Sequence, residues 1–252
     1  MPISSNTLFH FTSSIVNLLS ILEYDFRPHF SLEDLNAIMP GHPELEFGIP
    51  MVSFCDIPLS QTIKHLNVYG SYGIGLRKEW GVSNGICPVL YTYPRSLLAQ
   101  KLCELVQKIT QLPDTTGTSN QLLDDFHDIT CYVKPYEGNV ILSDGEEKSI
   151  RFYDEREWRY VPKLSEESFR YGLAKVAFED PEKIKDANKH LWSQDTIQFK
   201  PNDVKYLIVK LDKEILDLIK KVEELKGKRY SFDDIKLLSS RVISAEQIRS
   251  DF

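Results

Sequence analysis

Short stretches of alternating or continuous apolar residues predict most of the strands in this chain. In Thr7–Thr12, Phe9 and Phe11 alternate with His10 and Thr12, which is the two-residue period of a half-buried strand. The run Val204–Val209 is nearly continuous in apolar residues and predicts a central strand buried on both faces. Further strands are expected at 50–55, 73–76 and 88–93 and within 150–161.

Helices are expected where apolar residues recur every three or four positions. Ser13 or Ser14 can cap the first of them, whose apolar stripe consists of Ile15, Leu18, Leu19 and Leu22. Other helical patterns cover 97–109, 120–130, 181–192 and 213–226. The pair within about 95–131 is interpreted as a helical insertion. Strands near both ends with helices between them predict one α+β domain, 1–252, with a mixed sheet.

Composition narrows the class of protein. The chain has 252 residues, of which 42% are hydrophobic and 27% charged, so it can bury a sizeable core. A net charge of −7 argues against a protein that binds nucleic acid through its overall electrostatic field. It does not exclude a local basic groove. The four cysteines form no Cys-x-x-Cys pair, so no metal is expected. Neither a signal peptide nor an apolar run of about 20 residues is visible, which predicts a cytoplasmic protein with no membrane contact.

Two strands offer polar side chains that can line a cleft. On the first, His10 and Thr12 share the face opposite to the two phenylalanines. On the second, Ser53 lies on the face opposite to Val52 and Phe54. A strand at the sheet surface with a merely solvated histidine explains the first pattern without a function, and this alternative stays open.

A glycine-rich stretch, Tyr69–Gly75, can bring the backbone close to a ligand because it holds three glycines in six residues. Its spacing fits neither a dinucleotide-binding fingerprint nor a phosphate-binding loop. A tight turn leading into a strand is the simpler interpretation. Tyr69 or Tyr72 is nevertheless a candidate for stacking on a nicotinamide or adenine ring.

The acidic segment Tyr153–Arg159 is the strongest candidate for chemistry. If it is a strand, Glu155, Glu157 and Arg159 share one face, while Trp158 and Tyr160 pack on the other. A firmly packed strand with carboxylates on its free face is a suitable mount for a catalytic acid. The alternative is a solvated edge strand with a cross-strand ion pair.

Four segments in this order resemble the abortive phage-infection AbiGi family. They are Leu-Phe-His-Phe-Thr at 8–12, Val-Ser-Phe-Cys-Asp-Ile-Pro-Leu-Ser at 52–60, His65 with Tyr-Gly-Ser-Tyr-Gly-Ile-Gly-Leu at 69–76, and Glu-Arg-Glu-Trp-Arg at 155–159. Separately, His10-Phe11-Thr12 followed by Asn17-Leu18 is similar to the opening of DNA-modifying ADP-ribosyltransferase toxins. Together the resemblances imply a mixed, split sheet of the ADP-ribosyltransferase type and a role in phage defence or a toxin–antitoxin pair.

The resemblance also implies roles for individual residues. NAD would be the substrate, with Glu157 stabilising its oxocarbenium-like transition state and Glu155 acting as a base or as the alternative catalytic carboxylate. The residues that would bind NAD are His10, Thr12, Ser53, Tyr72 and Arg159. ADP-ribose would pass to a protein or nucleic-acid acceptor. Two other functions stay open: a non-catalytic antitoxin or sensor that binds a partner protein, and an RNA-acting protein that does not use NAD.

Overall fold

The computed structural model describes residues 4–36, 38–39, 46–112, 118–141, 147–163 and 172–251. The chain forms two compact units, each assembled from segments that are distant in sequence. The first unit contains Met1–Arg27, Ser53–Cys87 and Asp195–Phe252, and the second contains Pro28–Val52 and Pro88–Gln194. The single domain expected for 1–252 remains a prediction, and the two units are described separately.

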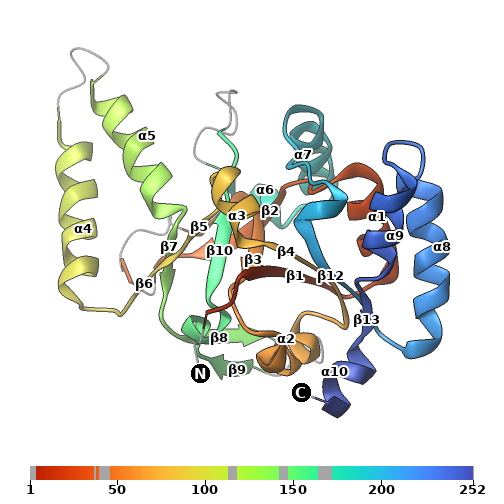
Figure 1. Cartoon of the computed structure of the whole chain (residues 1–252). Helices are drawn as coiled ribbons and strands as arrows, with labels where there is room; N and C mark the ends of the chain where they lie inside the picture. Colours follow the sequence, from red (N-terminus) through yellow and green to blue (C-terminus); the bar gives the residue numbers. More distant parts are fainter. Residues whose placement is uncertain are drawn as a thin grey trace. The chain divides into compact units, whose positions relative to one another are not determined.

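The first unit is built on a mixed sheet (Figure 1). Strand β1 (Thr7–Thr12) pairs antiparallel with β4 (Tyr72–Arg77), and β4 pairs antiparallel with β12 (Val204–Val209). Strand β13 (Val242–Ser244) then adds to β12 in parallel. The nearly continuous apolar run at β12 is explained by its position between two neighbours, with Leu207, Ile208 and Val209 fully buried.

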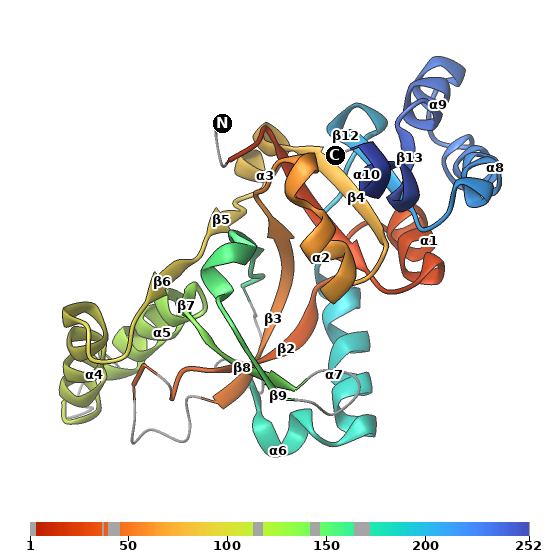
Figure 2. The same ribbon diagram turned by 90° about the horizontal axis from the view of Figure 1, so that it is seen from below.

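Helices pack around this sheet. Helix α1 (Ile15–Tyr24) begins where the Ser14 hydroxyl accepts a hydrogen bond from the Asn17 amide, which resolves the choice between the two serines. It lies beside α8 (Ile215–Lys226), and α8 contacts α9 (Phe232–Ser239) (Figures 1 and 2). The remaining helices are α2 (Ile63–Val68), α3 (Lys78–Ser83) and α10 (Ala245–Asp251).

The second unit contains several short strand pairings. The first part of β3 (Glu46–Cys55) pairs antiparallel with β2 (His29–Asp34) and with β11 (Leu173–Ala174). Strands β6 (Leu90–Thr92) and β7 (Val133–Pro135) pair in parallel, and β8 (Gly138–Ile141) pairs antiparallel with β9 (Glu147–Ile150). Strand β10 (Glu157–Tyr160) follows the 3-10 helix η3 (Phe152–Glu155).

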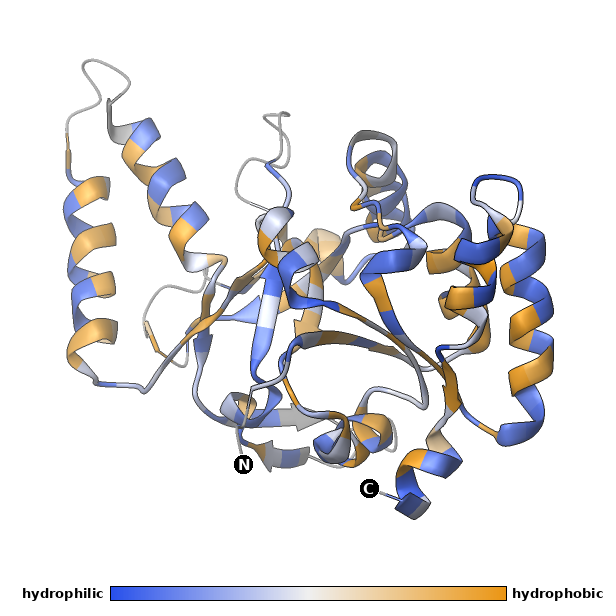
Figure 3. Cartoon of the chain, in the orientation of Figure 1, coloured by the Kyte–Doolittle hydropathy of each residue, from blue (hydrophilic) through white to orange (hydrophobic). Residues whose placement is uncertain are grey.

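The helical pair predicted within about 95–131 corresponds to α4 (Leu97–Thr110) and α5 (Thr118–Thr130). Ser96 caps α4, and hydrophobic positions recur along its length (Figure 3). Its buried side chains join a core with β3 and α5, among them Ala99, Leu102, Val106, Ile109, Phe47, Ile49, Met51 and Phe126. Helices α6 (Lys175–Phe178) and α7 (Pro181–Gln194) complete the unit.

The α+β class and the mixed sheet are confirmed, since β12–β13 is parallel and β1–β4–β12 is antiparallel. The finer expectation of an ADP-ribosyltransferase type of split sheet remains a prediction. Among the described residues, no helix is both long enough and apolar enough to cross a membrane.

Candidate functional site

The acidic segment contains a buried ion pair. Because side chains alternate along β10, Glu157 and Arg159 share one face, and they are only 5% and 0% exposed. Arg159 Nε donates to Glu157 Oε1 at 2.6 Å, and Nη2 donates to Oε2 at 3.1 Å. This is the two-point contact that a planar guanidinium makes with a carboxylate.

Further charged groups extend this pair into a network. Lys134 Nζ, from β7, lies 2.7 Å from Oε2 of Glu157 and 2.7 Å from Oε2 of Glu155. Arg159 Nη2 lies 2.9 Å from Glu33 Oε2, and Nη1 donates to the Cys131 carbonyl at 2.9 Å. We call the set Glu33, Lys134, Glu155, Glu157 and Arg159 the ion network. Its three carboxylates outnumber its two cations by one.

The network keeps its members charged. Burial alone would raise the pKa of Glu157, but the charges of Arg159 and Lys134 lower it to about 2. Burial alone would lower the pKa of Lys134, and the carboxylates of Glu157, Glu155 and Glu33 instead raise it above its usual value. Glu157 is therefore a permanent anion near neutral pH and is poorly suited to exchange protons with a substrate.

The free face predicted for the acidic segment is wrong. Glu157 and Arg159 point into the protein, whereas Trp158 and Tyr160, predicted to form the packed face, are half-buried. The alternation itself holds, but a mutually neutralising pair occupies the inner side. Burial of such a pair is tolerated because each charge has a partner and the remaining donors also find acceptors.

Glu155 does not lie on the strand with Glu157. It ends η3, and Arg156 follows it with a left-handed backbone at φ 47° before β10 begins. The expectation of one continuous acidic strand is wrong at this point because a left-handed residue breaks the extended backbone. Lys134 nevertheless reunites the two carboxylates by binding both.

In the first unit, the structure brings His10 and Ser53 together. His10 Nδ1 lies 2.9 Å from the Ser53 carbonyl oxygen, and the ring packs edge-on against Phe26 and Phe54. The contact involves the Ser53 backbone, rather than the hydroxyl on which the sequence hypothesis rests. His10 is half-buried, so this ring is held in a defined orientation rather than simply solvated.

Thr12 and Tyr72 face each other as partners on β1 and β4, and both have internal hydrogen bonds. Thr12 Oγ1 accepts from the Asn17 side chain at 2.8 Å. The Tyr72 hydroxyl donates to Glu214 Oε1 at 3.0 Å, and burial together with this carboxylate raises the pKa of Tyr72. Tyr72 is also buried, which disfavours the proposed stacking of a ligand on its ring.

Sequence reasoning missed Lys134, Glu33 and Tyr91 as members of the acidic site. Tyr91 supports the network from β6, because its hydroxyl accepts a hydrogen bond from the Glu157 amide at 2.9 Å. Lys134 lies on β7 between Val133 and Pro135, which are both buried. Because side chains alternate along a strand, Lys134 points to the face opposite to theirs, and this is the one local signal for the direction of its side chain. Nothing local indicates which carboxylates it meets.

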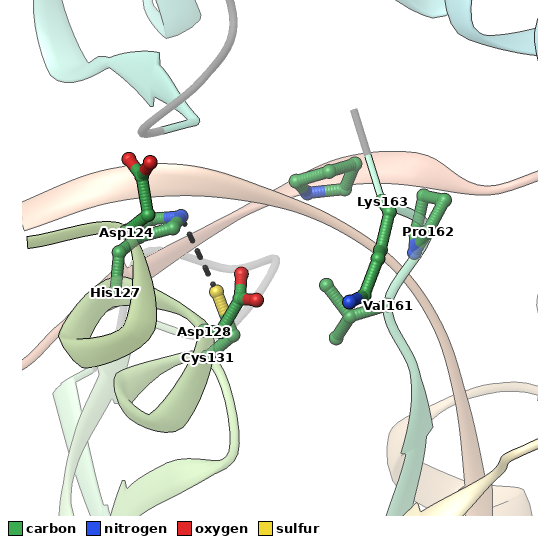
Figure 4. Close-up of a pocket in the computed structure, with 8 residues that line it drawn as sticks. Asp124, His127, Asp128, Cys131, Val161, Pro162 and Lys163 are labelled. Carbon is green, nitrogen blue, oxygen red and sulfur yellow. Dashed lines mark hydrogen bonds between the residues drawn. The ribbon is translucent and has the colours of Figure 1, made fainter. Parts of the chain in front are cut away.

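A separate pocket of about 170 Å³ lies in the second unit (Figure 4). Its lining comprises Pro50, Asp124, His127, Asp128, Cys131, Val161, Pro162 and Lys163. His127 Nε2 lies 3.4 Å from Cys131 Sγ, and burial raises the pKa of that thiol to about 12. The thiol is therefore not an activated nucleophile. The pocket is smaller than the roughly 300–1,000 Å³ typical of ligand sites, and none of the predicted NAD-site residues lines it.

The comparisons with known proteins support the resemblance to the AbiGi family. Residues 45–210, more than half of the chain, match the family model described as "Putative abortive phage resistance protein AbiGi, antitoxin". The chain belongs to the AbiGi family. The match includes Lys134, Glu155, Glu157 and Arg159. His10 and Glu33 lie outside the matched range.

A full-length relative supports the same assignment. The abortive phage resistance protein AbiGi of Lactococcus lactis subsp. cremoris is 26% identical over 253 residues, covering 90% of this chain and 99% of the relative. No solved structure matches. Membership in a family of abortive phage-resistance proteins is therefore shown by sequence, without support from a structural neighbour.

Proposed function

We propose that this chain acts in phage defence as an antitoxin-type protein, which binds a cognate toxin protein and restrains it without chemistry of its own. The observation that carries the proposal is the state of Glu157. Both of its carboxylate oxygens are bound by cations, Oε1 by the buried Arg159 and Oε2 by the half-buried Lys134. The antitoxin description of the AbiGi family model supports the same conclusion.

The physical reason concerns charge. Cleavage of NAD builds positive charge on the ribose, which a nearby carboxylate stabilises when its own charge is available. Glu157 is already neutralised by two cations at hydrogen-bonding distance. Using it for an oxocarbenium ion would require breaking contacts that offset the cost of burying it. The network is thus better explained as part of the scaffold of the second unit.

A partner protein needs an apolar surface, and α4 offers one. Leu98 and Leu105 are spaced by one heptad, and Leu112 continues the spacing just beyond the helix end. All three are at least one-third exposed although they lie beside a buried stripe. We call these three residues the leucine stripe. Exposed apolar side chains in a regular row are typical of protein-binding helices.

Co-expression tests the proposal directly. The chain is expressed in a naive host alone, and then together with the protein encoded beside it, and growth and co-purification are recorded. We expect no toxicity from the chain alone, rescue of growth when the partner is toxic, and a stable complex. Glu155→Gln, which removes one of the two ion pairs of Lys134, serves as the matched variant and should still rescue. Toxicity of the chain alone that Glu155→Gln or Glu157→Gln abolishes would contradict the proposal.

NAD-dependent ADP-ribosyl transfer is the second candidate, favoured by the His10–Ser53 contact. A histidine on the first strand, held by a neighbouring strand, is what the resemblance to ADP-ribosyltransferases implies for NAD binding. A thermal-shift titration with NAD tests it, since a ligand bound by the folded state raises the melting temperature. A shift that His10→Ala abolishes, with release of nicotinamide that Glu157→Gln abolishes, would establish this activity. The acceptor would then be sought among proteins and nucleic acids.

A further inference from the structure

Three tyrosines in the second unit form a stack that the function above does not use. The rings of Tyr93 and Tyr136 are 4.7 Å apart at 24°, and those of Tyr136 and Tyr153 are 5.2 Å apart at 19°. Tyr91 meets Tyr153 edge-on at 5.3 Å. We call Tyr93, Tyr136 and Tyr153 the tyrosine stack.

Backbone hydrogen bonds fix the stack in place. Tyr93 follows β6 and Tyr136 follows β7, and these strands are paired up to Thr92 and Pro135. The Tyr136 amide then donates to the Thr92 carbonyl at 2.9 Å, and the Tyr153 amide donates to the Tyr136 carbonyl at 3.1 Å. The rings are therefore preorganised by the main chain, so binding a ligand would cost little ordering of the side chains.

The two end rings remain open to solvent, Tyr93 at 46% and Tyr153 at 39% exposed. Tyr153 is covered on one side, because the guanidinium of Arg156 lies 5.4 Å from its ring centre. Tyr93 is the opposite end of the stack. A planar ring of a ligand that lies on the open face of Tyr93 would extend the stack that Tyr93 forms with Tyr136.

Two charged groups, one cation and one anion, lie near Tyr93. Arg151 lies 5.9 Å from the centre of the Tyr136 ring, and it is exposed. Partial burial and the adjacent Glu137 carboxylate raise the pKa of the Tyr93 hydroxyl, while Arg151 lowers it, which places both charges beside this ring. A guanidinium can bind a phosphate, and a carboxylate can accept hydrogen bonds from the amino edge of a base.

We propose that the open end of the tyrosine stack binds an unpaired base of single-stranded nucleic acid, with Arg151 contacting the adjoining phosphate. Aromatic side chains beside cationic groups are the usual platform for such strands, since every base presents a π-face. Duplexes are disfavoured because their bases are already stacked on one another. A purely apolar ligand is less favoured, since a cation and an anion lie beside the end ring.

The charge balance predicts how this binding depends on salt. Glu137 and Asp154 offset part of the positive charge of Arg151 and Arg156, and the chain as a whole is acidic. Binding therefore rests on stacking, with one or two phosphate contacts. The logarithm of the association constant should fall against the logarithm of salt with a slope of only about −0.7 to −1.4, as expected for one or two contacts on single strands.

Fluorescence anisotropy of labelled eight-nucleotide RNA and DNA strands tests the proposal with the full chain. Tyr93→Ala should weaken binding at least about 10-fold, as expected from losing a base–aromatic stack, whereas Tyr93→Phe should retain it. Arg151→Gln should weaken binding. It should also make the salt slope less negative by about 0.7, the contribution of one phosphate contact. Tyr24→Ala is the matched control, because Tyr24 is an exposed tyrosine beneath a guanidinium, that of Arg27 at 4.2 Å, outside the stack.

Several results would overturn the proposal. They are the absence of saturable binding to every single strand, equal loss of affinity in Tyr24→Ala and Tyr93→Ala, and equal binding of an unlabelled duplex competitor. Preference for RNA over DNA would indicate a contact to the 2′-hydroxyl, and equal affinity would indicate reading of base and phosphate alone. Because Tyr93 and Arg151 are exposed, each variant should fold, which circular dichroism checks.

Discussion

Lys134 and Glu157, 23 residues apart in the chain, form a buried ion pair with Nζ 2.7 Å from Oε2. Neither charge would be stable at this depth alone, because desolvation of a buried ion costs several kcal/mol. Their mutual attraction and the hydrogen bonds from Arg159 offset that cost. The pair thus joins β7 to β10 within the second unit, and its removal should be felt as a loss of stability.

Removing the lysine should be strongly destabilising. In Lys134→Met, Glu157 loses one of its two cations and Glu155 loses its ion pair, so we expect the free energy of unfolding to fall by about 3–5 kcal/mol. Urea unfolding followed by circular dichroism measures this change. Lys101→Met is the control, since Lys101 pairs with Glu104 at the exposed surface and should cost at most about 1 kcal/mol. Equal losses in the two variants would contradict the structural role.

The ion network also predicts a dependence of stability on pH. The pKa of Glu157 is about 2 in the folded protein and about 4.3 in an unfolded chain. Because the folded pKa is the lower one, the stabilisation is complete above about pH 5 and is lost as the pH falls toward 2. The comparison of wild type with Glu157→Gln isolates this contribution from those of other carboxylates. The thermal midpoint of the wild type should fall more steeply between pH 5 and pH 3 than that of the variant. Parallel curves would contradict the low pKa of Glu157 in the folded protein.

The cysteines should differ sharply in reactivity. Cys87 is exposed, whereas Cys131 is buried and its pKa is raised to about 12 by that burial. Partial burial also raises the pKa of Cys87, but its thiol is exposed to the reagent. Since the thiolate is the reactive form, iodoacetamide at pH 8 should label Cys87 well before Cys131, which should stay unlabelled until the protein unfolds. Peptide mass spectrometry locates the label. Early labelling of Cys131 in the folded protein would show that the pocket beside His127 activates the thiol.

The elements that sequence predicts well are those whose pattern is local. Strand β1, the Ser14 cap and the apolar run of β12 lie at their predicted places, because burial and capping act within a few residues. The alternation predicted for β1 is wrong in part, since Thr12 is buried while Phe11 is only half-buried. The helical pair α4 and α5 follows from the same periodicity. Such signals define elements, but they do not state which elements meet.

The acidic site shows where local signals end. Alternation correctly places Glu157 and Arg159 on one face, but it cannot tell whether that face is buried. That depends on Lys134 and Glu33, which come from distant segments and cancel the charges. The break at Arg156 is likewise invisible, since a left-handed backbone at an arginine has no compositional marker. A segment that resembles a catalytic strand in sequence is therefore part of a network of paired charges in the structure.

The leucine stripe gives the sharpest test of partner binding. Leu105 is 43% exposed on α4, so Leu105→Glu places a charge at the surface and should change the free energy of unfolding by only about 0.5 kcal/mol. If the stripe docks the cognate toxin, the same charge would be desolvated in the complex, and affinity should fall at least 10-fold. Leu216→Glu on α8 is the matched control, since Leu216 is 68% exposed and lies in the first unit. Co-purification and growth rescue that fail with Leu105→Glu and persist with Leu216→Glu would locate the interface. If the two variants co-purify and rescue growth equally, the partner does not bind at the leucine stripe. The antitoxin function itself is tested separately by the co-expression experiment.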